Sequence, residues 1–283
     1  ADMRSAAGLI AEYVNTFGVG LHFGPSLGLS SSLRGAGPGY TQFGETPALA
    51  AMGARAFGQT FGEEGINWMP MGFPGGDTNR TGANPPVLLT PKPSLDSVDL
   101  LPYREAIAGG AKFIHVGNVL VPTLEPEPVP ASVSYAVMTK LLREELGFDG
   151  IIVAGPMDDP ALTRHYDGPS APIRALMAGA DMVWWGAPGP RAEQFVGQLT
   201  VAVEQNQVPR SLIEERFRHV LQVKSDLELL AKPLPKSRDI EQLVREQEKN
   251  ALATRLEEAG IVVCKLKPGV LPIERGKTVP LGI

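Results

Sequence analysis

Short runs of apolar residues alternate along the chain with longer segments in which apolar residues recur at helical spacing. The short runs are almost wholly apolar, which is typical of strands covered on both faces. We expect strands at residues 19–23, 66–69, 112–116, 151–153 and 182–184. Regular alternation of strands with helices indicates parallel strands joined by right-handed crossovers, so the predicted fold class is α/β.

The helical segments have recognisable starts and ends. Pro47 opens a helix of small residues, Asp99 is expected to cap another, and Gly147 and Gly179 are expected to end two more. We expect helices at 4–15, 48–61, 100–108, 134–146, 171–178, 191–205 and 211–229. About five βα units are visible, fewer than a closed (β/α)8 barrel contains. An open doubly wound sheet is the alternative, but no strand precedes the Gly-x-Gly-x-x-Gly turn of a dinucleotide site.

The pattern divides the chain into three regions. Residues 1–231 contain the strands and helices just described. Residues 232–249 begin as a linker rich in Pro and Lys and continue into a charged helix, and residues 250–283 are expected to begin a second α/β domain. A segment rich in Gly and Ser, residues 26–46, interrupts the first region. Loops of this length are usually either functional or disordered.

Composition and charge exclude several classes of protein. Of the 283 residues, 43% are hydrophobic and 20% charged, which is typical of a chain with a folded core. A net charge of −5 provides no basic surface for nucleic acid, and no apolar run approaches the roughly 18 residues that span a bilayer. The single cysteine, Cys264, excludes an internal disulfide, and no group of His, Asp or Glu has metal-site spacing. We therefore expect no metal and no cofactor.

Five segments together carry a family resemblance that none of them carries alone. They are F-P-G-G-D-T at 73–78, L-P-Y-R-E-A-I at 101–107, L-L-R-E-E-L-G-F-D-G at 141–150, R-A-L-M-A-G-A-D-M at 174–182 and V-L-P-I at 270–273. In order and spacing they resemble glycoside hydrolase family 3, most closely its β-N-acetylhexosaminidase branch. The resemblance runs from about residue 4 to the end and implies a TIM-barrel-like (β/α)8 domain. The family's first three strands would precede residue 1, so the resemblance implies a barrel that is incomplete at its N-terminus.

The resemblance also implies catalytic groups that this sequence lacks. Retaining glycosidases use a carboxylate nucleophile and a proton donor. The branch's nucleophile, an Asp after the strand at 151–153, corresponds to Gly155, and its His–Asp acid/base loop corresponds to residues 79–83, which contain neither. The family's sugar-binding positions fall on Gly28, Thr41, Met71, Gly72 and Asn118. Framework motifs therefore persist while each ionisable group of the site is replaced.

Three interpretations remain open. In the first, the domain is catalytically inactive and serves carbohydrate binding or assembly with a partner. In the second, an active β-N-acetylhexosaminidase or β-glucosidase uses a relocated nucleophile, Asp158 or Asp159, with His165 or Asp77 as proton donor. In the third, the barrel hosts an unrelated chemistry. The first is favoured over the second, because a displacement of about 1 Å can slow a reaction on the order of 10²-fold.

The residues that would contact a ligand lie after the predicted strands. They are Phe73, Asp77, Arg80, Asn118 and Trp184. Trp184 can either stack on a sugar or pack under the following loop, since the carboxyl ends of barrel strands form the site. The expected ligand is an amino-sugar glycan, and a partner chain or a second copy is expected to complete the barrel, because bare strand edges are unfavourable in water.

Several of these residues also have structural interpretations. Asp158 and Asp159 are expected to cap a short helix that begins at Pro160, and Asp77 to hold a turn by bonding backbone amides. His115 is expected to be a core histidine with satisfied hydrogen bonds, and His219 to lie on the surface of an amphipathic helix.

Overall fold

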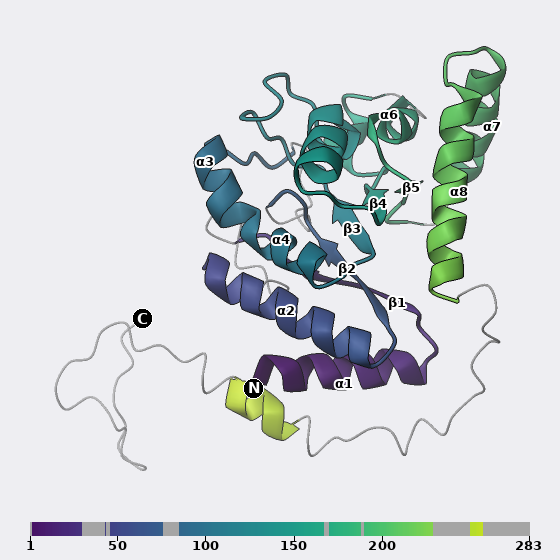
Figure 1. Cartoon of the computed structure of the whole chain (residues 1–283). Helices are drawn as coiled ribbons and strands as arrows, with labels where there is room; N and C mark the ends of the chain where they lie inside the picture. The colour runs from purple at the N-terminus through teal and green to yellow at the C-terminus, as the bar shows by residue number, and fades with distance from the viewer. Residues whose placement is uncertain are drawn as a thin grey trace, which may run out of the picture.

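The structure is a computed structural model that describes residues 2–29, 43, 46–75, 85–166, 170–187, 190–228 and 250–256. Its strands are β1 (Leu21–Ser26), β2 (Asn67–Met71), β3 (Phe113–Val116), β4 (Ile151–Ala154) and β5 (Met182–Val183). Its longer helices are α1 (Asp2–Thr16), α2 (Pro47–Glu63), α4 (Leu101–Ala108), η4 (Ala136–Glu145), α6 (Ser170–Ala178), α7 (Pro190–Glu204) and α8 (Arg210–Asp226). Shorter helical segments are α3 (Lys92–Ser94), η2 (Leu95–Asp99), η3 (Ala131–Val133) and α5 (Pro160–Thr163), and residues 250–256 are also helical (Figure 1).

The five described strands run parallel to their neighbours and follow one another in chain order. β1 pairs with β2, and β3, β4 and β5 form a second ladder. A bridge between Phe73 and Val116 joins the two ladders, and the Phe73 N–H donates to the His115 carbonyl at 3.0 Å. Sequential order without a reversal is that of a barrel wall, whereas a doubly wound sheet reverses its order. The fold is therefore α/β and TIM-barrel-like, as predicted.

One face of the strands carries the larger core. Ile152 and Ala154 of β4 point to this face, where they join buried residues of the covering helices. The contributing helix residues include Ala7, Phe57, Phe61, Tyr103, Met138 and Ala175, from α1, α2, α4, η4 and α6. Small residues of α2, such as Gly58, allow close packing, since a β-carbon there would already contact the indole of Trp68 at 3.4 Å. This helical side corresponds to the outside of a barrel.

The opposite, inner face is covered by α8. Ile151 and Val153 alternate with the outward residues of β4 and form a second core with Met69 and Phe113. Val223 of α8 is buried in this core, and Figure 1 shows α8 along one side of the strands, with α7 beside it. β3 and β4 are fully buried, which confirms that these central strands are covered on both faces.

The inner face stays partly open at its two outer strands. Phe23 of β1 is 51% exposed and Met182 of β5 is 38% exposed. Among the described strands, the large exposed apolar side chains therefore lie on the two outer strands, because α8 covers the middle of the inner face. None of the described helices is both long and apolar enough to cross a membrane.

Two expectations for the elements were wrong, and a third element has an unusual winding. Asp99 does not cap α4, because the chain is already helical in η2, where Asp99 is buried and the Leu100 N–H bonds to the Leu95 carbonyl. The helix predicted at 134–146 is present as η4, which winds as a π-helix, with the Leu146 N–H bonding five residues back to Leu141. His219 does not lie free on the surface of α8, because both of its ring nitrogens contact groups at the amino ends of β4 and β5.

The two glycine helix ends were predicted correctly. η4 ends before Gly147, which has a φ of +66°, and α6 ends before Gly179, which has a φ of +122°. The predicted linker at 232–249, the segment 257–283 with Cys264, and most of the loop at 26–46 lie outside the described residues.

Candidate functional site

Gly155, which the family resemblance places at the nucleophile's position, follows the last residue of β4. Its φ is +141°, a conformation that residues with a side chain rarely adopt. A β-carbon on Gly155 would lie 2.8 Å from both the Cδ1 atom and the carbonyl oxygen of Trp184. The Gly155 N–H is also bonded to the Val116 carbonyl at 3.2 Å. A carboxylate therefore cannot be placed at this position without moving the backbone and Trp184.

His115 lies beneath Gly155 and is fully buried. Its Nε2 is 2.8 Å from the Gly155 carbonyl oxygen, and its Nδ1 accepts from the Gly72 N–H at 3.4 Å. The neutral ring with a proton on Nε2 satisfies both partners. Burial lowers the pKa of His115 to about 4, although the bond to Gly155 acts in the opposite direction. The prediction of a satisfied core histidine is confirmed, and a neutral ring is not a proton donor of the kind that the reaction needs.

Asp158 holds the loop that follows β5. Its Oδ1 accepts from the Gly186 N–H at 2.7 Å and its Oδ2 accepts from the Ala187 N–H at 3.0 Å. Both carboxylate oxygens therefore have backbone donors from the same loop. Asp158 therefore has a structural role, in which its carboxylate holds the loop after β5 without any contribution from a substrate.

Asp159 caps the short helix α5. Its Oδ1 accepts from the Ala161 N–H at 2.8 Å, which confirms the predicted cap, and its Oδ2 accepts from the Asn118 side-chain amide at 3.1 Å. The His165 side chain lies at the surface in the turn after α5. Asp159 and His165 are therefore close in sequence, but the Asp159 carboxylate is bonded to protein donors and not to His165.

Asn118 ties three segments together at the carboxyl ends of the strands. Its amide nitrogen donates to the Pro156 carbonyl at 2.9 Å as well as to Asp159, and its oxygen accepts from the Ser132 hydroxyl at 2.5 Å. Asn118 is only 4% exposed. Its predicted ligand contact stays a prediction, since its amide already serves the scaffold.

An aromatic group faces the inner side of the same region. The rings of Phe23 and Trp184 meet edge to face with centroids 6.2 Å apart, and the Trp184 ring lies 5.8 Å from that of His115. The Trp184 Nε1–H is buried and has no hydrogen-bond partner among the described residues. Sequence reasoning missed Phe23, although its place two residues after Leu21 puts both on one face of β1.

The remaining predicted site residues are scattered. Phe73 is fully buried, and its ring packs edge to face on Tyr103 with centroids 5.1 Å apart. The structure therefore gives Phe73 a packing role in place of the predicted ligand contact. Asp77 and Arg80 lie outside the described residues. Within the part of the chain that is described, no group of three or more His, Cys, Asp or Glu could hold a metal ion.

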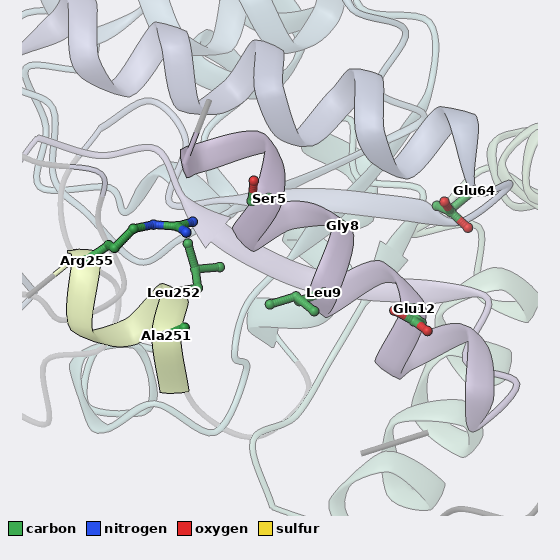
Figure 2. A pocket seen from close by; sticks show the side chains of 8 residues that line it. All are labelled: Ser5, Gly8, Leu9, Glu12, Glu64, Ala251, Leu252 and Arg255. Carbon is green, nitrogen blue, oxygen red and sulfur yellow. The ribbon is translucent and has the colours of Figure 1, made fainter. Parts of the chain in front are cut away.

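A pocket of about 690 Å³ lies elsewhere, between α1 and the helical residues 250–256 (Figure 2). It is lined by Ser5, Gly8, Leu9, Glu12, Glu64, Ala251, Leu252 and Arg255. These residues belong to α1, to the turn after α2 and to the C-terminal helical segment, so the pocket is on the helical outside of the strands. It is therefore separate from the site around Gly155.

Comparison with known proteins supports the resemblance. Residues 2–223 match the model of the glycosyl hydrolase family 3 N-terminal domain. The chain is 26% identical to a beta-hexosaminidase A of Pseudoalteromonas piscicida, over 78% of this chain and 40% of that protein. It is 24% identical to a beta-N-acetylglucosaminidase/beta-glucosidase of Cellulomonas fimi, over 96% of this chain and 50% of that protein.

A solved structure of a family 3 enzyme has a similar fold. The family 3 beta-N-acetylglucosaminidase of a Paenibacillus species superimposes with a TM-score of 0.81 at 29% identity, over 90% of this chain and 49% of that one. The chain thus spans about half the length of these relatives. Because the family model covers most of the chain and the strand order is that of a barrel wall, the chain belongs to glycosyl hydrolase family 3 through its N-terminal domain.

Proposed function

We propose that this chain is a family 3 domain that does not hydrolyse glycosides and that binds an amino-sugar glycan at the carboxyl ends of its strands. The observation that carries the proposal is steric. Trp184 occupies the space that a side chain on Gly155, the predicted position of the nucleophile, would need. Retaining hydrolysis requires a carboxylate at that position. A domain without one keeps the fold but loses the chemistry.

The relocated nucleophile of the alternative interpretation is opposed by the contacts of Asp158 and Asp159. Each of the four carboxylate oxygens accepts a hydrogen bond from a protein donor. A nucleophile would have to give up these contacts to approach an anomeric carbon. The same contacts support a role for both aspartates in holding loops at the rim of the site.

The glycan part of the proposal is supported by the aromatic pair at the inner face. Phe23 offers a half-exposed ring next to Trp184, and the apolar face of a pyranose packs well on such rings. Relatives that match this chain are named as hexosaminidases and N-acetylglucosaminidases, which supports an N-acetylated sugar as the ligand.

Two measurements test this function. Chromogenic N-acetyl-β-glucosaminide and β-glucoside should show no turnover at acidic, neutral or alkaline pH, in the wild type and in the Asp158→Asn/Asp159→Asn double variant alike. Turnover by the wild type that the double variant abolishes would establish the relocated nucleophile instead. N,N′-diacetylchitobiose should raise the melting temperature of the wild type and should do so less in Phe23→Ala.

The control for this binding test is Phe217→Ala, which removes another exposed ring from α8, 61% exposed, and should leave the effect of the sugar unchanged. A sugar that stabilises neither the wild type nor the control would overturn the binding part of the proposal. The result on turnover would stand independently.

A second role, assembly with a partner chain, is favoured by the two outer strands. β1 and β5 each pair with only one neighbour among the described strands, and Phe23 and Met182 leave apolar surface beside them. Light scattering after gel filtration tests this role. We expect the wild type to form a complex and the Met182→Lys variant to be a monomer. A wild type that stays monomeric at high concentration would exclude self-assembly.

A further inference from the structure

Helix α8 is fastened at the amino ends of β4 and β5 by Asp181. The Asp181 side chain has no exposed surface. Its Oδ2 accepts from the Ile152 N–H at 2.8 Å and from the Arg143 guanidinium of η4. Its Oδ1 faces α8, where it lies 2.8 Å from the His219 Nδ1 and 3.8 Å from the Arg216 Nη1.

The imidazole of His219 has an acceptor at both ring nitrogens. Nδ1 faces the Asp181 carboxylate at 2.8 Å, and Nε2 faces the Asp149 carbonyl oxygen at the same distance. A neutral imidazole has one N–H and can donate to only one of these oxygens. Only the imidazolium, with two N–H groups, donates to both.

We propose that protonation of His219 controls how firmly α8 lies over the inner face of the sheet. In the protonated state, His219 links α8 to the loops before β4 and β5. In the neutral state one nitrogen presents its lone pair to an oxygen, so that contact is lost and α8 is held less tightly. Val220 and Val223, which neighbour His219 on α8, pack on the inner core of Met69, Phe113, Ile151 and Val153. Loosening α8 would therefore uncover this apolar face.

The other charged groups around His219 determine how strongly its protonation affects the contact between α8 and the sheet. Arg143 of η4 and Arg216 of α8 both contact Asp181, so the carboxylate keeps cationic partners when His219 is neutral. Both arginines also repel the imidazolium, while Glu215 of α8 pairs with Arg216 on the solvent side and reduces that repulsion. The Asp149 backbone carbonyl, which faces Nε2, is an acceptor that only a protonated Nε2 satisfies. The outcome is a graded loosening of α8 rather than its release.

The sign of the pH dependence follows from the two acceptors. The pair of contacts needs two N–H groups, so α8 is expected to be held more firmly at the acidic end than at the alkaline end of the window from about pH 5 to about pH 8. His115 stays neutral in the folded protein throughout this window, because burial lowers its pKa to about 4, and its effect on global unfolding is common to α8 and α2. The exposed His165 provides a matched control outside the cluster.

Amide hydrogen exchange of the full chain tests the proposal, with the protection of α8 expressed relative to that of α2 in the same sample. In the wild type this ratio should fall by roughly tenfold between about pH 5.5 and about pH 8, the effect expected for losing one hydrogen bond to a charged group. His165→Gln should behave like the wild type. His219→Gln should show the low ratio at both pH values. An unchanged wild-type ratio, or a pH response that persists in His219→Gln, would overturn the proposal.

A second measurement keeps the proposal testable if His219→Gln fails to fold. Nitrogen-15 spectra of the wild-type imidazoles report how many ring nitrogens carry a proton. Two protonated nitrogens on His219 below its transition, with loosening of α8 at the same pH, are expected. A neutral His219 throughout this range would contradict the proposed device.

Discussion

The indole of Trp184 occupies the space into which a side chain at Gly155 would project, with its Cδ1 atom 2.8 Å from the position of a β-carbon. Gly155 directly follows β4, at the position where the family resemblance predicts the nucleophile, whereas Trp184 follows the neighbouring strand β5. The side chains that can stand at these two positions therefore depend on each other. Glycine makes room for the indole, and the indole leaves no room for an aspartate.

Restoring the nucleophile by Gly155→Asp should therefore destabilise the protein and should not produce hydrolysis. The positive φ and the contact with Trp184 together should lower the free energy of unfolding by at least about 2 kcal/mol. Urea unfolding measures this change. Gly197→Ala in α7 is the matched control, since nothing lies within 4 Å of its β-carbon position, and it should stabilise by about 0.5 to 1 kcal/mol. Equal effects of the two substitutions would contradict the steric account.

Removing the carboxylate of Asp159 should cost stability at the rim of the site. Asp159→Ala removes the cap of α5 and the contact with Asn118, which should lower the free energy of unfolding by about 1 to 2 kcal/mol. Asp159→Ser is the control, because serine also caps helices and should recover part of this loss. Thermal unfolding monitored by circular dichroism compares the two variants, and a neutral Asp159→Ala would argue against the structural role.

The buried His115 should make the protein less stable in mild acid. Its pKa is about 4 in the folded protein and about 6.5 in the unfolded chain, so only the unfolded chain gains the proton as pH falls between these values. Stability should be unaffected above about pH 6.5 and should decline by on the order of 3 kcal/mol by about pH 4.

The His115→Gln variant isolates this effect, because glutamine can retain a hydrogen bond but does not titrate. The difference in unfolding free energy between wild type and variant should change with pH in the stated window. A constant difference would mean that His115 is protonated as readily in the folded protein as in the unfolded chain.

The hydroxyl of Tyr103 should contribute to the junction between α4 and β2. Tyr103 is fully buried and donates to the Met71 carbonyl at 3.0 Å, and burial raises its pKa well above the usual range. Tyr103→Phe leaves this carbonyl without its donor and should lower the free energy of unfolding by about 1 kcal/mol. Tyr135→Phe, at a ring that is 51% exposed, should be neutral. Equivalent results for both tyrosines would show that the buried hydrogen bond contributes nothing measurable.

Local sequence signals predicted most of the elements. Almost wholly apolar runs predicted β3 and β4. Gly147 and Gly179 predicted the ends of η4 and α6, and in the structure both have a positive φ. These features depend on short-range patterning and backbone geometry. The cap at Asp159 was predicted for the same reason. The cap at Asp99 was not, since the helical segment η2 before it depends on how the whole connection packs.

The order of motifs along the chain also predicted the family, which the family model confirms, and predicted that Gly155 stands at the nucleophile's position, because both depend on residue identity. Three features were decided only by the tertiary structure. They are the indole of Trp184 beside Gly155, the backbone donors that hold Asp158, and the contact of His219 with Asp181. Each joins residues about 30 to 40 positions apart, and no local pattern specifies which distant group will fill the space beside a side chain. The sequence by itself therefore predicted which catalytic groups are absent, and the packing of distant elements decided which side chains lie around Gly155, Asp158 and His219.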